Sequence, residues 1–138
     1  MSQSIETRFL ESRTPKLAFD IRAGAEPTLL CVHGNSSHRG LWGPLLRRLS
    51  DHAALRLDLR GHGESDWAFP PAYSTADYAD DIRAAAETLG GREFVLVSHS
   101  NGSLASIYDN RRDRDQQLVL AYKLHKPCKP FFQSSLRC

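Results

Sequence analysis

Runs of apolar residues alternate with mixed segments along this chain, and the two kinds of pattern predict strands and helices in turn. The runs Thr28–His33, Ala53–Leu59 and Phe94–Val97 are almost entirely apolar, which is typical of strands buried on both faces of a sheet. Two half-apolar runs nearer the start, Ile5–Glu11 and Leu17–Arg22, predict an antiparallel pair. Gln117–Tyr122 has the composition of a further parallel strand.

Helical spacing fills the gaps between these runs. From Leu41 to Leu49, leucines recur three and four residues apart, which predicts a helix with one apolar face. A second helix is expected to begin at Ser74 or Thr75 and to end at Gly90-Gly91. Its expected apolar stripe consists of Tyr78, Ile82, Ala85, Ala86 and Leu89. Strands alternating with helices predict an α/β fold, a mostly parallel sheet with helices on both faces.

Three polar segments follow the predicted buried strands, at the sheet edge where α/β proteins bind ligands. The first is His33-Gly34-Asn35-Ser36-Ser37, the second runs from Asp58 to Asp66 (DLRGHGESD), and the third is Ser98-His99-Ser100-Asn101-Gly102. In the third, a serine between two small residues sits where a strand gives way to helical spacing, which is the arrangement of a nucleophile elbow. The three segments and their order closely resemble the N-terminal half of the α/β-hydrolase family, over residues 5–102 and, with the next predicted strand, to Tyr122.

The resemblance implies an incomplete α/β-hydrolase fold and a role for each motif residue. Ser100 would be the nucleophile, and the backbone amides of Asn35 and Asn101 would form the oxyanion hole, which holds the charge that develops on the substrate oxygen. The family usually has glycine where this chain has Ser98, so we expect a modest loss of stability there. The residues expected to shape the loops are His33, Gly34, Gly61, His62, Gly63 and Gly102.

The family's acid and base follow the nucleophile in the chain. Here the candidates that follow Ser100 are Asp109, Asp113, Asp115 and His125. The rest of the sequence leaves little room for additional strands. His125 is either the base or a histidine of an irregular tail. Asp58 is either a loop organiser or a catalytic acid, and Trp42 and Trp67 either line a pocket mouth or pack in the core and loops.

Composition changes after residue 122. All nine glycines occur by Gly102, and no Asp or Glu follows Asp115. We therefore divide the chain into a partial α/β-hydrolase domain, residues 1–122, and an irregular tail, residues 123–138, that a truncation or frameshift would explain. An intact reading frame encoding this tail in the full-length product would refute that hypothesis.

Bulk properties narrow the function further. The net charge of +2 is small, and the tail lysines lack interleaved aromatics except Phe131-Phe132, so we expect neither nucleic acid nor a membrane as partner. No metal-type cluster, complete dinucleotide motif or signal peptide is visible, so we expect no cofactor and no metal. Three cysteines without metal spacing, with Cys31 in an apolar run, favour a reducing, cytoplasmic location.

Two functional hypotheses remain. The first is a serine hydrolase that acts on a small-molecule ester or related carbonyl substrate and is impaired as it stands. The second is a non-catalytic binding module or an inactive fragment, in which an apolar edge strand at residues 118–121 forms a homodimer.

Overall fold

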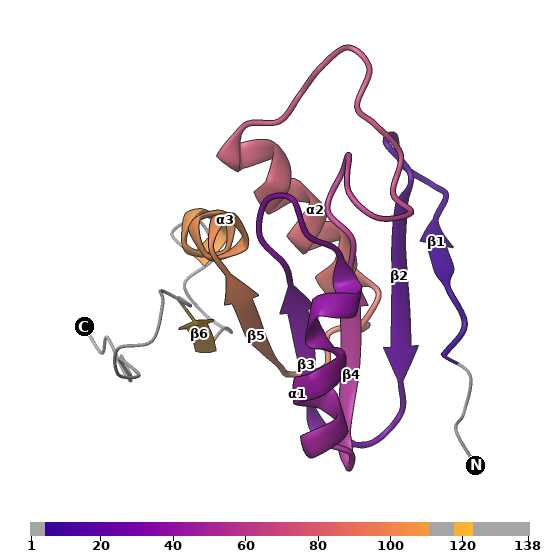
Figure 1. The fold of residues 1–138 in the computed structure, drawn as a ribbon, viewed down its shortest axis with the longest axis vertical. Coiled ribbons are helices and arrows are strands. Elements are labelled where there is room, and N and C mark those ends of the chain that lie inside the picture. Colours follow the sequence, from indigo (N-terminus) through magenta and orange to yellow (C-terminus); the bar gives the residue numbers. More distant parts are fainter. Residues whose placement is uncertain (1–4, 111–117, 123–138) are drawn as a thin grey trace.

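A computed structural model describes residues 5–110 and 118–122 of the 138-residue chain, with side chains over residues 5–108. A single twisted sheet runs through the molecule in the order β1-β2-β4-β3-β5-β6 (Figure 1). The strands are β1 (Arg8–Leu10), β2 (Leu17–Arg22), β3 (Ala25–Val32), β4 (His52–Leu57), β5 (Phe94–His99) and β6 (Leu118–Tyr122). The helices are the 3₁₀ helix η1 (Arg39–Trp42), α1 (Gly43–Arg48), α2 (Thr75–Glu87) and α3 (Asn101–Asn110).

Strand directions match the pattern expected from the sequence. β3 pairs in parallel with β4 and β5, and β5 pairs in parallel with β6. β2 pairs antiparallel with β1 and β4, so the predicted antiparallel pair joins the sheet as its edge. The parallel strands therefore end at one edge of the sheet, at the top of Figure 1, where the three motif segments emerge.

Both faces of the sheet are covered, which confirms the predicted α/β class. Alternation along β3 sends Leu30 and Val32 into a large core with the apolar stripe of α2 and with Ala105 of α3. Leu29 and Cys31 face the other way, into a smaller core with Trp42 and Leu46 from η1 and α1. The helices lie on opposite sides of the sheet, α1 in front and α2 behind in Figure 1.

The helix α2 begins and ends as its sequence predicts. Ser74 is the N-cap, and it forms a capping box with Asp77 in which each side chain accepts from the other's backbone N–H. Gly90 and Gly91 follow the helix with φ of +62° and +79°, which glycine adopts without steric cost. The helix expected at residues 41–49 is divided into η1 and α1, because Pro44 lies in the first turn of α1 and starts a new segment there.

Of the predictions made for the C-terminal part of the chain, the structure tests only the strand that ends at Tyr122. β6 confirms a strand within the segment predicted at residues 117–122. The tail expected at residues 123–138 and the candidate base His125 lie outside the described residues, as do Asp113 and Asp115.

Candidate active site

Ser100 stands at a sharp corner between β5 and α3. β5 ends at His99 and α3 begins at Asn101, so this one residue makes the turn. Its φ of +54° lies in the left-handed region, which costs a residue with a Cβ about 1–2 kcal/mol. The side chain is exposed, and the structure gives its hydroxyl no hydrogen-bond partner within the described residues. The corner thus has a strained backbone and presents, above the sheet, a hydroxyl without a partner among the described residues.

Two glycines let the first and third motif segments approach this corner. A Cβ on Gly34 would lie 2.8 Å from the Cβ of Ser100, and one on Gly102 would overlap the carbonyl oxygen of His33. Neither position therefore accommodates a side chain without movement of the backbone. The loop after β3 consequently packs directly against the start of α3.

Backbone N–H groups at the start of α3 are available beside Ser100. The first backbone bonds of this turn run from the N–H groups of Ser103 and Leu104 to the carbonyl of Ser100, at 2.9 and 3.3 Å. The amides of Asn101 and Gly102 precede them and have no carbonyl within the helix to bond. Asn35 lies close by, since the side-chain amide of Asn101 donates to its Oδ1 at 3.1 Å. The structure thus brings Asn35, Ser100 and Asn101 together.

His33 is completely buried at the base of the first loop. Its Nε2 accepts from the backbone N–H of Leu59 at 3.0 Å, and its Nδ1 lies 2.7 Å from the carbonyl oxygen of Gly34, to which it donates. These partners fix the neutral tautomer, and burial lowers the pKa of His33 to about 4. This ring joins the loop after β3 to the end of β4 and has no free nitrogen for proton transfer.

Asp58, at the end of β4, uses its carboxylate to organise loops. Oδ1 accepts from the backbone N–H of Arg39 at 2.6 Å, while Oδ2 accepts from the Arg39 guanidinium and from the Glu64 N–H at 3.0 Å. Gly63, with φ of +53°, lies against the same carboxylate, where any side chain would collide with it. Of the two roles left open for Asp58, this geometry favours the loop organiser.

Arg39 extends this network beyond Asp58, and the sequence analysis missed it. Its guanidinium also donates to Asp20 of β2 at 3.0 Å, to Thr7 at 2.7 Å and to Glu64 at 2.8 Å. Asp20 is only 4% exposed and in turn accepts two bonds from Arg56. The sequence held one signal for this network, the acidic residue Asp20 inside the apolar run of β2. A buried carboxylate requires a cationic partner.

A second buried ion pair fixes the following loop. Arg60 donates to Asp81 of α2 through Nε and Nη2, and its backbone N–H bonds the same carboxylate. His62 lies beside this pair, with its Nδ1 2.9 Å from the carbonyl oxygen of Arg60. Gly61, with φ of +71°, packs under the ring of Tyr73. The second motif segment is therefore a rigid support.

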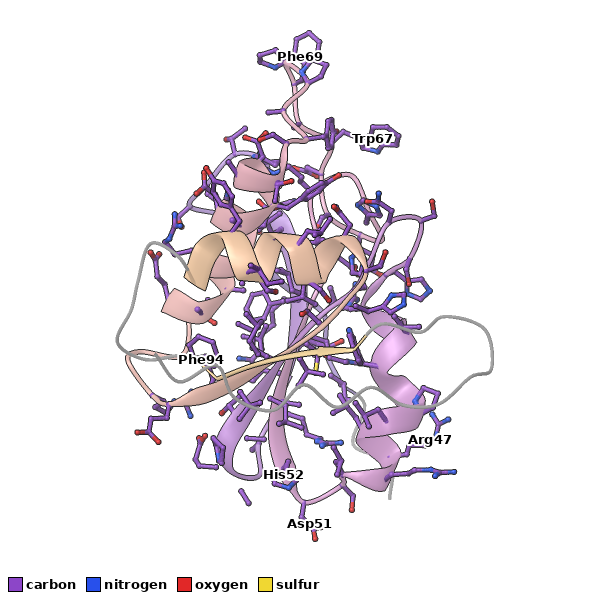
Figure 2. All side chains as sticks on the ribbon, turned by 90° about the vertical axis from the view of Figure 1, so that its left-hand side faces the viewer. Arg47, Asp51, His52, Trp67, Phe69 and Phe94 are labelled. Atoms are coloured by element: carbon purple, nitrogen blue, oxygen red, sulfur yellow. The ribbon has the colours of Figure 1, made fainter. Side chains whose placement is uncertain are left out.

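The remaining residues singled out in the sequence have separate surroundings. Ser98, expected to strain the elbow, is buried and its hydroxyl lies 3.3 Å from that of Ser103. Trp42 is buried in the smaller core, whereas Trp67 is 79% exposed. Trp67 and Phe69 project from the loop before α2, at the far end of the molecule from Asp51 and His52 (Figure 2).

A base for Ser100 is not found among the described residues. Five of the six histidines lie in the described part of the chain, and no hydrogen bond joins any of them to Ser100. Within that part, no group of three or more His, Cys, Asp or Glu could hold a metal ion. Two hollows of about 570 and 330 Å³ are lined by Arg13 and Arg83 and by Arg22 and Arg92, respectively, and neither includes Ser100.

Comparison with known proteins gives one consistent result. Residues 29–123 match the model of the Alpha/beta hydrolase family. A 2-(acetamidomethylene)succinate hydrolase of Mesorhizobium japonicum is 40% identical over 85 residues, which are 61% of this chain and 30% of that protein. A 2-succinyl-6-hydroxy-2,4-cyclohexadiene-1-carboxylate synthase of Pectobacterium atrosepticum is 34% identical over 89 residues, which are 62% of this chain and 33% of that one.

Solved structures agree with the sequence relatives. The crystal structure of E-2-(acetamidomethylene)succinate hydrolase superposes with a TM-score of 0.73 at 32% identity, covering 83% of this chain and 42% of that one. An N-acyl homoserine lactonase complexed with N-hexanoyl homoserine lactone gives a TM-score of 0.74 at 27% identity, covering 83% and 45%. The chain thus spans about a third of the length of these curated relatives and less than half of these structures. Among the described residues, no helix has the length and apolar character needed to cross a bilayer.

Proposed function

The chain belongs to the α/β-hydrolase family, and on that premise we propose that it is a serine hydrolase in which Ser100 attacks an ester or related carbonyl group. The observation that carries the proposal is the corner itself. A left-handed Ser100, whose exposed hydroxyl has no partner within the described residues, is followed by Asn101, and the Asn101 side chain bonds Asn35 of a separate loop. Relatives whose names describe hydrolases support the reaction class, and the substrate is a small molecule.

In the proposed reaction, the Ser100 oxygen adds to the carbonyl carbon while its proton passes to a base. The carbonyl oxygen becomes an oxyanion, which accepts hydrogen bonds from the N–H groups of Asn35 and Asn101. Collapse expels the alcohol, which takes the proton, and leaves an acyl group on Ser100. Water then cleaves that ester and restores the hydroxyl.

Support for the two donors comes from the placement of their segments. Gly34 packs against the Cβ of Ser100, and Asn35 follows it directly. Asn101 opens α3, so its amide has no helical acceptor. An oxyanion forming above Ser100 would find one donor in each of the two segments that meet here.

The base is the missing part of this proposal. His33 is engaged through both ring nitrogens, and His125 lies outside the described residues and stays a candidate. We propose that the chain alone forms the acyl-enzyme slowly, since the oxyanion hole and binding contribute to the rate even where a triad member is absent.

The test is labelling with a fluorophosphonate probe, followed by mass spectrometry of the labelled peptide. We expect one adduct, on Ser100, that is absent from Ser100→Ala and retained in Ser103→Ala. Folded, monodisperse chain that forms no adduct over long incubation would refute the serine-hydrolase proposal.

One observation favours a second candidate, a binding module. In the described part of the sheet, β6 pairs only with β5 and forms an edge of the sheet, and apolar edge strands recruit further strands. This candidate predicts a homodimer through β6. Light scattering would detect a mass of two chains that Val119→Lys with Ala121→Lys reduces to one, whereas a monomeric wild-type chain would exclude it.

A further inference from the structure

The tip of the first loop is attached to the rest of the molecule at a single polar point. Within the described residues, Asn35, Ser36 and Ser37 are involved in one hydrogen bond with another segment, from the side-chain Nδ2 of Asn101 to the Oδ1 of Asn35. The residues on either side are held differently. Gly34 bonds the His33 ring and Arg39 bonds Asp58. The tip therefore lies between two firm anchors and depends on this one bond.

The two residues that share this bond are those whose backbone amides would form the oxyanion hole. They lie 66 residues apart in the sequence and belong to different loops. A side-chain bond between them constrains how far apart their backbone N–H groups can be. Since an oxyanion donor must lie at about 2.7–3.1 Å from the charged oxygen, this separation matters for the reaction.

We propose that the Asn101–Asn35 side-chain bridge is a positioning device that sets the width of the oxyanion hole. The inference rests on the proposed function of Ser100 and deepens it. Both side chains act through the backbone to which they are attached, so we assign them as positioning residues. Their own amide groups take no part in bond making or breaking.

Local competition explains why such a bridge is needed. An asparagine oxygen without a partner readily accepts from the backbone N–H two residues further on, which here belongs to Ser37. That turn would draw the Asn35 side chain back into its own loop. Ser36, with φ of +57°, already holds a conformation unfavourable for a residue with a Cβ. The bridge keeps the Asn35 oxygen engaged across the gap and the strained tip in place.

The exposure of the bridge allows its positioning role to be distinguished from a general contribution to stability. The bridge is exposed to solvent, and a single hydrogen bond between neutral groups contributes little to the stability of the whole fold. Its removal should leave the fold intact and change the loop alone. The expected signature is a local loss of protection together with a slower reaction at Ser100.

The experiment compares the full chain with Asn101→Ala, Asn35→Ala and the double variant, using Leu104→Ala as the control. Leu104 also lies on α3 and is 59% exposed, so its truncation tests for a general effect on the helix. The first measurement is hydrogen–deuterium exchange of peptides covering residues 34–38. The second is the rate of phosphonylation of Ser100 as a function of fluorophosphonate concentration.

We expect faster exchange at residues 34–38 in each Asn variant. In Leu104→Ala, exchange at these residues should stay as in the wild-type chain. The maximal phosphonylation rate should fall about tenfold, less than the 10²–10³-fold that loss of a whole donor costs, with the half-saturating concentration unchanged. The double variant should be no slower than the singles, because both remove the same bond.

Two results would overturn the bridge: unchanged exchange at residues 34–38 in Asn101→Ala, or single effects that multiply in the double variant. Failure of the wild-type chain to react at Ser100 would refute the proposed function instead. The exchange comparison would then still decide whether the bridge holds the loop.

Discussion

The carboxyl ends of β4 and β5 lie at the same edge of one sheet, yet they are built in opposite ways. After β4, Asp58 is completely buried. Its Oδ1 accepts from Arg39, and its Oδ2 accepts from Arg39 and Glu64. After β5, Ser100 is exposed and strained, and its hydroxyl has no partner within the described residues. One end is saturated with interactions, and the other is left open.

The difference shows how rigidity and reactivity are divided in this part of the fold. A group whose hydrogen bonds are all satisfied stabilises the loops around it but has little left for a ligand. A residue held in the left-handed region costs stability, and the surrounding structure must compensate for that strain. Here Asp58 accepts from the backbone N–H of Arg39, at the end of the loop that approaches Ser100, so the saturated end supports the open one.

The strongest test of this contrast is to break the saturated end. Asp58→Asn removes a charge that Arg39 needs while keeping the size of the side chain. Arg39 keeps its ion pairs with Asp20 and Glu64, but an amide NH2 cannot accept the hydrogen bonds that the buried carboxylate accepts from Arg39 and Glu64. We therefore expect the free energy of unfolding to fall by about 3 kcal/mol. Urea denaturation measures it. A change below about 1 kcal/mol would contradict the assignment of this network as the structural support.

Lowering the pH should destabilise the fold through His33, whose ring bonds the segment at the saturated end. Its pKa in the folded chain is about 4 because of burial, below the unfolded value of about 6.5. As the pH falls from 6.5 to 4, the unfolded chain binds a proton that the folded chain does not, so stability decreases, by roughly 3 kcal/mol in total. His33→Gln should flatten this part of the stability curve relative to wild type. An equally steep curve in both proteins would contradict the prediction.

At the open end, backbone strain predicts an inverted order of two substitutions. With φ of +54° at residue 100, Ser100→Gly should be more stable than Ser100→Ala by about 1 kcal/mol. In the interior of an ordinary helix the order is the reverse, and Ala84→Gly in α2 should cost about 1 kcal/mol. Thermal unfolding of the three variants measures both differences. Equal stability of the two Ser100 variants would show that the corner is unstrained.

The smallest effect concerns the buried thiol of Cys31, which lies in the smaller core. Burial raises the pKa of its thiol to about 12, so almost none of it is thiolate at pH 8. We expect iodoacetamide to leave Cys31 unmodified in the native chain and to modify it fully in the urea-unfolded chain. Peptide mass spectrometry would detect the difference. Rapid modification in the folded chain would mean that the core around β3 opens easily.

Much of the fold follows from the periodicity of the sequence. The buried strands, the helix α2 with its Ser74 cap and the corner at Ser100 are all local patterns within about fifteen residues. Boundaries were less predictable. β4 ends at Leu57 instead of Leu59, because the backbone N–H of Leu59 bonds His33 and no longer a neighbouring strand.

The interactions that support the site were not predictable in the same way, because they join distant segments. Arg39 meets Asp58 and Asp20 only once three strands are side by side, and no local pattern identifies such partners. Asp81 gave a signal, since it is an acidic residue next to the apolar stripe of α2, but its partner Arg60 lies 21 residues away. The bridge between Asn35 and Asn101 spans 66 residues and carries no sequence signature.

The central claim is that Ser100 is a nucleophile served by donors from two loops, and a structure of the chain treated with diethyl p-nitrophenyl phosphate tests it most directly. We predict a phosphoryl group on Ser100 with its oxygen in hydrogen-bond contact with the backbone N–H groups of Asn35 and Asn101. An unmodified Ser100, or a phosphoryl oxygen that contacts neither group, would contradict the account.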